Sequence, residues 1–203
     1  MRLFVYLTLG LLLLISIGLL GCQRQEETKP KTPVNYFSMH VNGQLWTPYQ
    51  DPIDPCRSTY SGQYTELQYS SGEIKPFYRF VAYRDSTGRA DVYSDTYLRM
   101  QVMNVTKPDA YILNGFYGED FDSFITFKVE QPDGSFKRYT NNARRIPMVV
   151  YVDEISFMKN VSIPSIKGTF SGVIYNETNP SDSLIIEQGR YNFKYMGGFH
   201  CGF

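Results

Sequence analysis

The stretch Phe37-Ser38-Met39-His40-Val41-Asn42-Gly43 decides the fold class of this chain. Its residues at positions 37, 39 and 41 are apolar and alternate with polar residues at 38 and 40. Such alternation is typical of a β-strand with one face on a hydrophobic core. The Asn-Gly pair that follows is the strongest short-range signal for a two-residue hairpin turn. The stretch therefore predicts a strand that turns back on itself in an antiparallel hairpin.

The same alternation returns along the chain, between short turns rich in Gly, Pro, Asn and Asp. Strands are expected at Phe77–Arg84, Tyr97–Val105, Ile125–Glu130, Phe136–Tyr139, Ile166–Ile174 and Tyr191–Tyr195, with a turn at Pro132-Asp133-Gly134. No window of about twelve residues shows helical periodicity. The pattern predicts an all-β fold, either an antiparallel β-sandwich or a partly open barrel. Residues 50–76 are the least regular part, and we expect a long loop or an insertion there.

The N-terminus has the layout of a secretory signal. Arg2 is followed by 18 mostly apolar residues, Leu3–Leu20, and then by Gly21 and Cys22. A cysteine at this boundary resembles a bacterial lipoprotein signal, which implies that residues 1–21 are removed and that Cys22 carries the lipid. Two alternatives stay open. One is an uncleaved helix long enough to span a membrane, and the other is cleavage elsewhere, which would leave Cys22 as an ordinary thiol.

The segment after this cysteine predicts a tether. Gln23–Pro33 contains no apolar residue except proline, so it cannot bury enough surface to fold, and we expect a flexible lipid-anchored linker over residues 22–34. Gln23 and the pair Glu26-Glu27 resemble the sorting signals of outer-membrane and surface lipoproteins. We therefore expect a single domain at residues 35–203 that is lipid-anchored to the outer membrane, on its periplasmic face or at the cell surface.

The charges of the chain are nearly balanced. The chain has 20 Lys and Arg against 20 Asp and Glu, and loss of Arg2 with the signal leaves a net charge of −1. This balance gives no electrostatic reason to propose nucleic acid as a partner. The part of the chain beyond the linker is long enough for one domain with a sizeable core.

Three stretches of the chain resemble a known group of proteins. They are Val41-Asn42-Gly43-Gln44-Leu45-Trp46 near the start, Ile166-Lys167-Gly168-Thr169-Phe170-Ser171-Gly172 later on, and Ile185-Ile186-Glu187-Gln188-Gly189-Arg190-Tyr191-Asn192-Phe193 near the end. With these stretches the chain resembles the small all-β lipoproteins of Bacteroidota that are classified as domains of unknown function. The resemblance implies a fold and a location, but no activity that could be transferred.

Two further cysteines, Cys56 and Cys201, lie near opposite ends of the domain. In an oxidising compartment such a pair more often forms a disulfide than stays reduced, and this bond would close a loop of about 145 residues. The alternative is a zinc site with His40 and His200, since Cys and His are tetrahedral zinc ligands. The spacings match no zinc finger or ribbon, so we expect the disulfide and no metal.

The search for catalytic and cofactor motifs is negative. The chain contains no Gly-x-Ser-x-Gly elbow, His-Glu-x-x-His helix or phosphate-binding glycine loop, and we expect no cofactor. The densest acidic group is Glu119, Asp120 and Asp122, whose carboxylates could bind a cation weakly through oxygen ligands. Acidic residues in a loop are also commonly just solvated.

The wealth of aromatic residues suggests a binding function. Tyrosines offer a flat apolar face and a hydroxyl group to a ligand. The candidate contacts are Tyr60, Tyr64, Tyr69 and Tyr117, which fall in or near irregular segments. The simpler reading is that tyrosine is favoured in strands and half-buried loops. The sequence thus favours a lipid-anchored, non-catalytic binding module for a glycan, a peptide or an envelope partner. The alternatives are an envelope assembly accessory and a small hydrolase with an unrecognised site.

Overall fold

The structure is a computed structural model of the chain and describes residues 35–50, 59–68, 70–84, 96–115, 122–142, 144–156 and 164–194. These residues belong to one compact unit, Lys31–Phe203. The strands are β1 (Tyr36–Val41), β2 (Gln44–Trp46), β3 (Tyr60–Gln68), β4 (Ile74–Tyr83), β5 (Tyr97–Met103), β6 (Asp109–Leu113), β7 (Phe124–Glu130), β8 (Phe136–Thr140), β9 (Met148–Ser156), β10 (Ser165–Asn176) and β11 (Ser183–Phe193). No helix in these ranges is long and apolar enough to cross a membrane.

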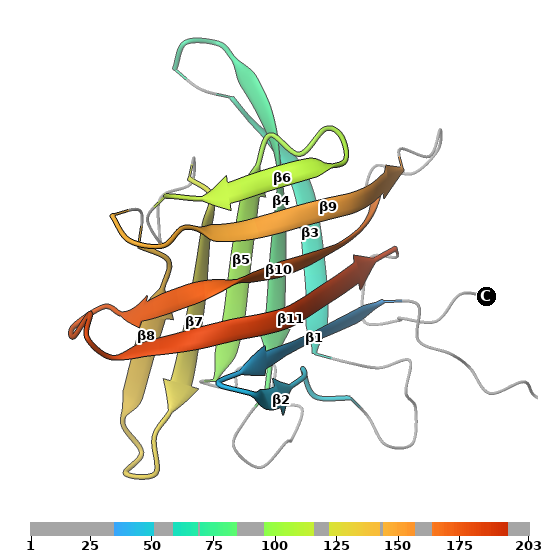
Figure 1. The fold of residues 1–203 in the computed structure, drawn as a ribbon. Helices are drawn as coiled ribbons and strands as arrows, with labels where there is room; N and C mark the ends of the chain where they lie inside the picture. The colour runs from blue at the N-terminus through green and yellow to red at the C-terminus, as the bar shows by residue number, and fades with distance from the viewer. Residues whose placement is uncertain are drawn as a thin grey trace, which may run out of the picture. The chain divides into compact units, whose positions relative to one another are not determined.

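The strands form one curled antiparallel sheet, a half-barrel. Hydrogen bonds join them in the order β2-β1-β11-β10-β8-β7-β5-β4-β3, while β9 also pairs with β10, and β6 with β9. In Figure 1 the rear half of the sheet (β3, β4, β5, β7 and β8) runs across the front half (β1, β2, β6, β9, β10 and β11). The predicted all-β class and the antiparallel arrangement are confirmed.

The hairpin predicted from the opening stretch is confirmed. β1 and β2 pair antiparallel, with Val41 opposite Gln44. Asn42 and Gly43 at the turn have φ angles of 49° and 79°, as a two-residue hairpin turn with positive φ at both positions requires. The Asn42 N–H donates to the Ile185 carbonyl at 2.9 Å, and the Asn42 Oδ1 accepts from the Ile185 N–H at 2.8 Å. The turn is therefore fastened to β11.

A cluster of aromatic rings fills the space between the two halves of the sheet. Phe80 of β4 is fully buried, and its ring lies 5.1 Å from that of Tyr191 and 6.4 Å from that of Phe193, both on β11. On its own half of the sheet it stacks on Tyr78 at 5.6 Å and on Tyr60 at 6.3 Å. Burial of this apolar surface is the main force that holds the halves together.

Residues 50–76 are more regular than predicted. They contain all of β3 and the start of β4, and nine β3 residues pair without interruption with β4. The pattern was hidden because Gly62 stands where an apolar residue would be expected. A Cβ atom at Gly62 would lie 2.9 Å from the ring of Phe193, so the phenylalanine ring from β11 takes the place of a side chain on β3.

Gly168 on β10 permits a contact between the two strands that flank it. The buried Tyr191 side chain of β11 crosses β10 at Gly168, and its hydroxyl donates to the Tyr151 carbonyl of β9 at 3.0 Å. The register of β9 against β10 shifts between Lys167 and Gly168, which is a β-bulge. Burial raises the pKa of the Tyr191 phenol, so it remains a donor at neutral pH.

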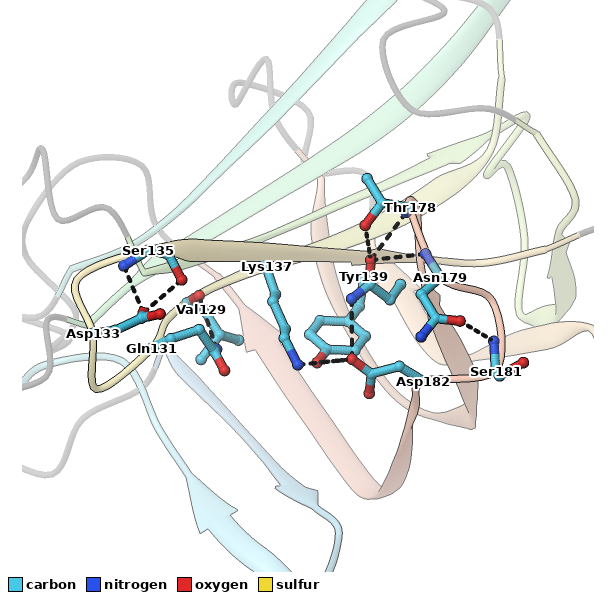
Figure 2. Close-up of polar contacts among 11 residues, drawn as sticks. Val129, Gln131, Asp133, Ser135, Lys137, Tyr139, Thr178, Asn179, Ser181 and Asp182 are labelled. Atoms are coloured by element: carbon cyan, nitrogen blue, oxygen red, sulfur yellow. Dashed lines mark hydrogen bonds and ion pairs between the residues drawn. The ribbon is translucent and has the colours of Figure 1, made fainter.

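The two halves of the sheet are joined by a short seam between β8 and β10. Only two residue pairs of this ladder are present, Tyr175 with Thr140 and Asn176 with Tyr139. Figure 2 shows the side-chain cluster that supplements it, centred on Asp182 in the turn between β10 and β11. The Oδ2 atom of Asp182 accepts from Lys137 Nζ at 3.0 Å, from the Tyr139 hydroxyl at 3.1 Å and from Asn176 Nδ2 at 3.0 Å.

This seam makes stability depend on pH. Hydrogen bonds from Asn176 and then Lys137 lower the pKa of the Asp182 carboxyl. A carboxyl whose folded pKa is lowered stabilises the fold above its unfolded pKa, and this stabilisation is lost as the pH falls through the folded value. We therefore expect Asp182→Asn to lower the melting temperature at pH 7. The difference in melting temperature between the variant and the wild type should become smaller below about pH 4.

Thermal unfolding followed by circular dichroism between pH 7 and pH 2 measures this gap. The matched control is Asp153→Asn, at an exposed position of β9, which we expect to change the melting temperature little at any of these pH values. A gap for Asp182→Asn that stays constant down to pH 2 would contradict a role for the ionised carboxylate in the seam.

Candidate functional site

A groove of about 480 Å³ lies between the β1–β2 hairpin and the ends of the rear strands. Its lining residues come from β1, β2, β7 and β11, with Arg84 directly after β4 and Thr96 directly before β5; Figure 1 shows where these strands lie. The residues that line it are Val41, Asn42, Gln44, Leu45, Trp46, Arg84, Thr96, Phe127, Val129, Glu130 and Leu184. The lining combines an apolar floor with a few polar groups, which is the usual composition of a small-molecule site.

Trp46 is the largest side chain in the groove and is held in a fixed position. Its ring makes an edge contact with Phe127 of β7 at 5.4 Å and another with Phe37 of β1 at 6.2 Å. It is partly buried and packs against the core. Because two rings from different halves of the sheet hold the indole, the groove has a preorganised aromatic surface.

Three polar side chains complete the groove: Arg84 after β4, Glu130 at the end of β7 and Gln44 at the start of β2. Their side chains make no hydrogen bond or ion pair with another residue in the described parts of the chain, and Arg84 and Glu130 are more than 4 Å apart. Thr96 fixes the backbone of two of them. Its carbonyl accepts from the Arg84 N–H at 3.0 Å, and its Oγ1 accepts from the Glu130 N–H at 3.2 Å. Thr96 thus positions the backbone of Arg84 and of Glu130 at the groove.

One protein-family model matches most of the chain. A family model described as a domain of unknown function (DUF5025) matches residues 34–194. The chain belongs to the DUF5025 family. The prediction of a domain-of-unknown-function family is therefore confirmed, and the match includes every residue that lines the groove. No curated protein and no solved structure matched this chain.

Two of the tyrosines predicted as ligand contacts lie in the described part of the DUF5025 domain, and neither lines the groove. Tyr60 is 1% exposed and belongs to the core, where its ring contacts Phe37 at 5.4 Å, so a ligand in solvent cannot reach it. The sequence predicts that Tyr60 lies in or near an irregular segment, whereas it begins β3. Tyr64 is half-buried and packs on Tyr78 at 4.9 Å, and burial raises the pKa of its phenol.

The other predicted site residues lie outside the described residues, with one exception. The exception is Asp122, whose carbonyl accepts from the buried Gln101 Nε2 at 2.9 Å, next to the start of β7. Those outside are Cys22, Cys56, Tyr69, Tyr117, Glu119, Asp120 and Cys201. Within the described ranges no three His, Cys, Asp or Glu residues come together as a metal site would require.

The residues of the groove carried weak signals in the sequence. Trp46 is the single tryptophan of the chain and follows the Asn-Gly turn by three positions. A tryptophan on a three-residue edge strand, which has little core of its own to fill, is the signal that could have pointed to a binding surface. Arg84 and Glu130 stand at strand ends, where charged residues are ordinary.

Proposed function

We propose that this protein is a lipid-anchored binding protein of the cell envelope that holds a small ligand in the groove beside Trp46. The observation that supports this function is the combination of the Trp46 indole, held between two rings, with three polar side chains that have no partner among the described residues. Polar groups positioned by the backbone around an apolar floor are what a binding site needs to orient a ligand. The tether predicted at residues 22–34 would present this groove at a distance from the membrane.

The single tryptophan offers a direct test of binding. Because Trp46 is the single tryptophan and lines the groove, its fluorescence emission reports on changes in the surroundings of the groove. We expect at least one of three ligand pools (glycans, short peptides and fatty acids) to change the emission of the full chain in a saturable way.

The double variant Arg84→Ala with Glu130→Ala should lose this response and keep the unfolding transition of the wild type. The matched control carries Arg190→Ala and Glu187→Ala at exposed positions of β11, and it should respond as the wild type does. If no pool changed the emission, or if the double variant responded normally, the groove would not be the binding site.

The anchor and the disulfide are part of the proposal. β3 begins and β11 ends side by side, since the rings of Tyr60 and Phe193 lie 6.0 Å apart. Cys56 precedes Tyr60 by four residues and Cys201 follows Phe193 by eight, and segments of these lengths can readily bring two cysteines together. The described fold therefore supports pairing of Cys56 with Cys201.

Intact-mass measurement tests both modifications. We expect the protein extracted from membranes to begin at Cys22 and to carry the mass of a diacylglycerol and an acyl chain. After alkylation without reductant, neither Cys56 nor Cys201 should gain a label, and after reduction both should. Two labels before reduction would refute the disulfide, and a mass without lipid would refute the anchor.

A further inference from the structure

We infer that the ligand of the groove is a short, uncharged saccharide, with one sugar ring against Trp46 and its hydroxyl groups on Arg84, Glu130 and Gln44. This inference rests on the proposed function, because it names the ligand class of the same groove. It is drawn from the chemistry of the lining residues.

The apolar part of the groove fits one face of a sugar ring. A pyranose has a face of C–H groups that packs on an aromatic ring, and its hydroxyl groups point outward from the ring edge. Trp46 provides an aromatic surface held by two rings, and the apolar side chains of Val129 and Leu184 also line the groove. A preorganised surface lowers the entropic cost of binding, because the indole is already held by Phe37 and Phe127.

The polar part of the groove fits hydroxyl groups. The carboxylate of Glu130 accepts hydrogen bonds, the guanidinium of Arg84 donates them, and the amide of Gln44 does both. All three are planar groups with two or more bonding atoms, so each can bond two neighbouring hydroxyls at once. These side chains make no bonds within the described parts of the chain, so a saccharide would displace no partner that belongs to those parts.

The charges of the lining favour an uncharged ligand. One cation, Arg84, and one anion, Glu130, make the groove formally neutral. An anionic ligand would meet Glu130 and a cationic ligand would meet Arg84, and either contact would offset the gain from the opposite charge. A fatty acyl chain would cover all three polar side chains without bonding to them, which costs free energy.

Titrations of the full chain, followed by Trp46 emission, test this inference. The probes are di- and trisaccharides of glucose, galactose, mannose and N-acetylglucosamine, a set of neutral tripeptides, and octanoate. We expect saturable binding with at least one saccharide. Glu130→Gln should weaken this binding by about tenfold, because the glutamine oxygen still accepts a hydrogen bond but without the negative charge that strengthens it. Glu187→Gln, at an exposed position of β11, is the matched control and should leave the affinity unchanged.

The outcomes distinguish the saccharide assignment from the proposal that the groove is a binding site. Binding of a tripeptide or of octanoate, without any saccharide, would overturn the saccharide assignment and leave the groove as a binding site. Saccharide binding that Glu130→Gln does not weaken would overturn the assigned role of the polar groups. If no probe and no ligand pool changed the Trp46 emission, the proposed function itself would be overturned.

Discussion

Substitution of Gly168 by alanine should destabilise the domain by about 3 kcal/mol or more, the upper range for overpacking in a core. A Cβ atom at this position would overlap the Tyr151 carbonyl oxygen and the Tyr191 hydroxyl. The carbonyl belongs to the backbone of β9 and cannot turn away, so β9 and β10 must separate. Separation would also break the hydrogen bond between Tyr191 and Tyr151. Chemical denaturation followed by Trp46 emission measures the loss of stability.

Two variants show whether the clash is the cause. Thr169→Ala changes the next residue of β10, which is exposed, and should alter stability by about 0.5 kcal/mol or less. Gly168→Ala combined with Tyr191→Phe removes the hydroxyl but leaves the contact with the Tyr151 carbonyl, so it should not restore the wild-type stability. Full stability of Gly168→Ala alone would show that β9 and β10 do not approach each other as closely as described.

Substitution of Phe80 by alanine should cost about 3–5 kcal/mol, the usual range for removal of a buried phenylalanine ring. Phe80 is 0% exposed and contacts four rings from β3, β4 and β11. The resulting cavity would lie between the rear and front halves of the sheet, where rigid rings cannot close it easily. The free energy of unfolding in guanidinium chloride, compared with the wild type, measures the effect.

The control for this prediction is another phenylalanine of the sheet. Phe136 of β8 is 41% exposed, and its ring is covered by the Lys128 ammonium group at 4.1 Å. Phe136→Ala should therefore cost about 1 kcal/mol or less. Equal losses for the two variants would mean that the rings around Phe80 do not form the core between the halves.

The sequence predicted the strands that bury alternate residues. Leu98, Met100 and Val102 were expected on one face of a strand, and all three are at most 1% exposed on β5. The hairpin at Asn42-Gly43 could be predicted because its signal is local, in the residues that form the turn. β3 could not be predicted because its inner face contains Gly62. The space beside this glycine is filled by the ring of Phe193, which comes from a distant part of the chain.

The candidate site could not be predicted in the same way. Trp46, Arg84 and Glu130 come from β2 and from the ends of β4 and β7, and they meet only because the sheet curls. Curvature of the sheet also explains why a tyrosine predicted to contact a ligand is buried. Tyr60 falls in the stretch predicted as a long loop, but the rings of Phe80 on β4 and Phe193 on β11 pack against it. Residue type alone does not distinguish a binding aromatic from a core aromatic when curvature decides which side it faces.

The place of β1 in the sheet determines how the domain would respond to a mechanical pull. The proposed tether would transmit its force into β1, which lies between β2 and β11. The Lys194 N–H donates to Asn35 Oδ1 at 2.7 Å, directly ahead of the strand. Extraction of β1 would draw the buried side chains of Phe37 and Met39 into water. Force from the proposed membrane anchor would therefore be resisted by the core of the domain, and a pulled molecule should stay folded until β1 itself separates from β11.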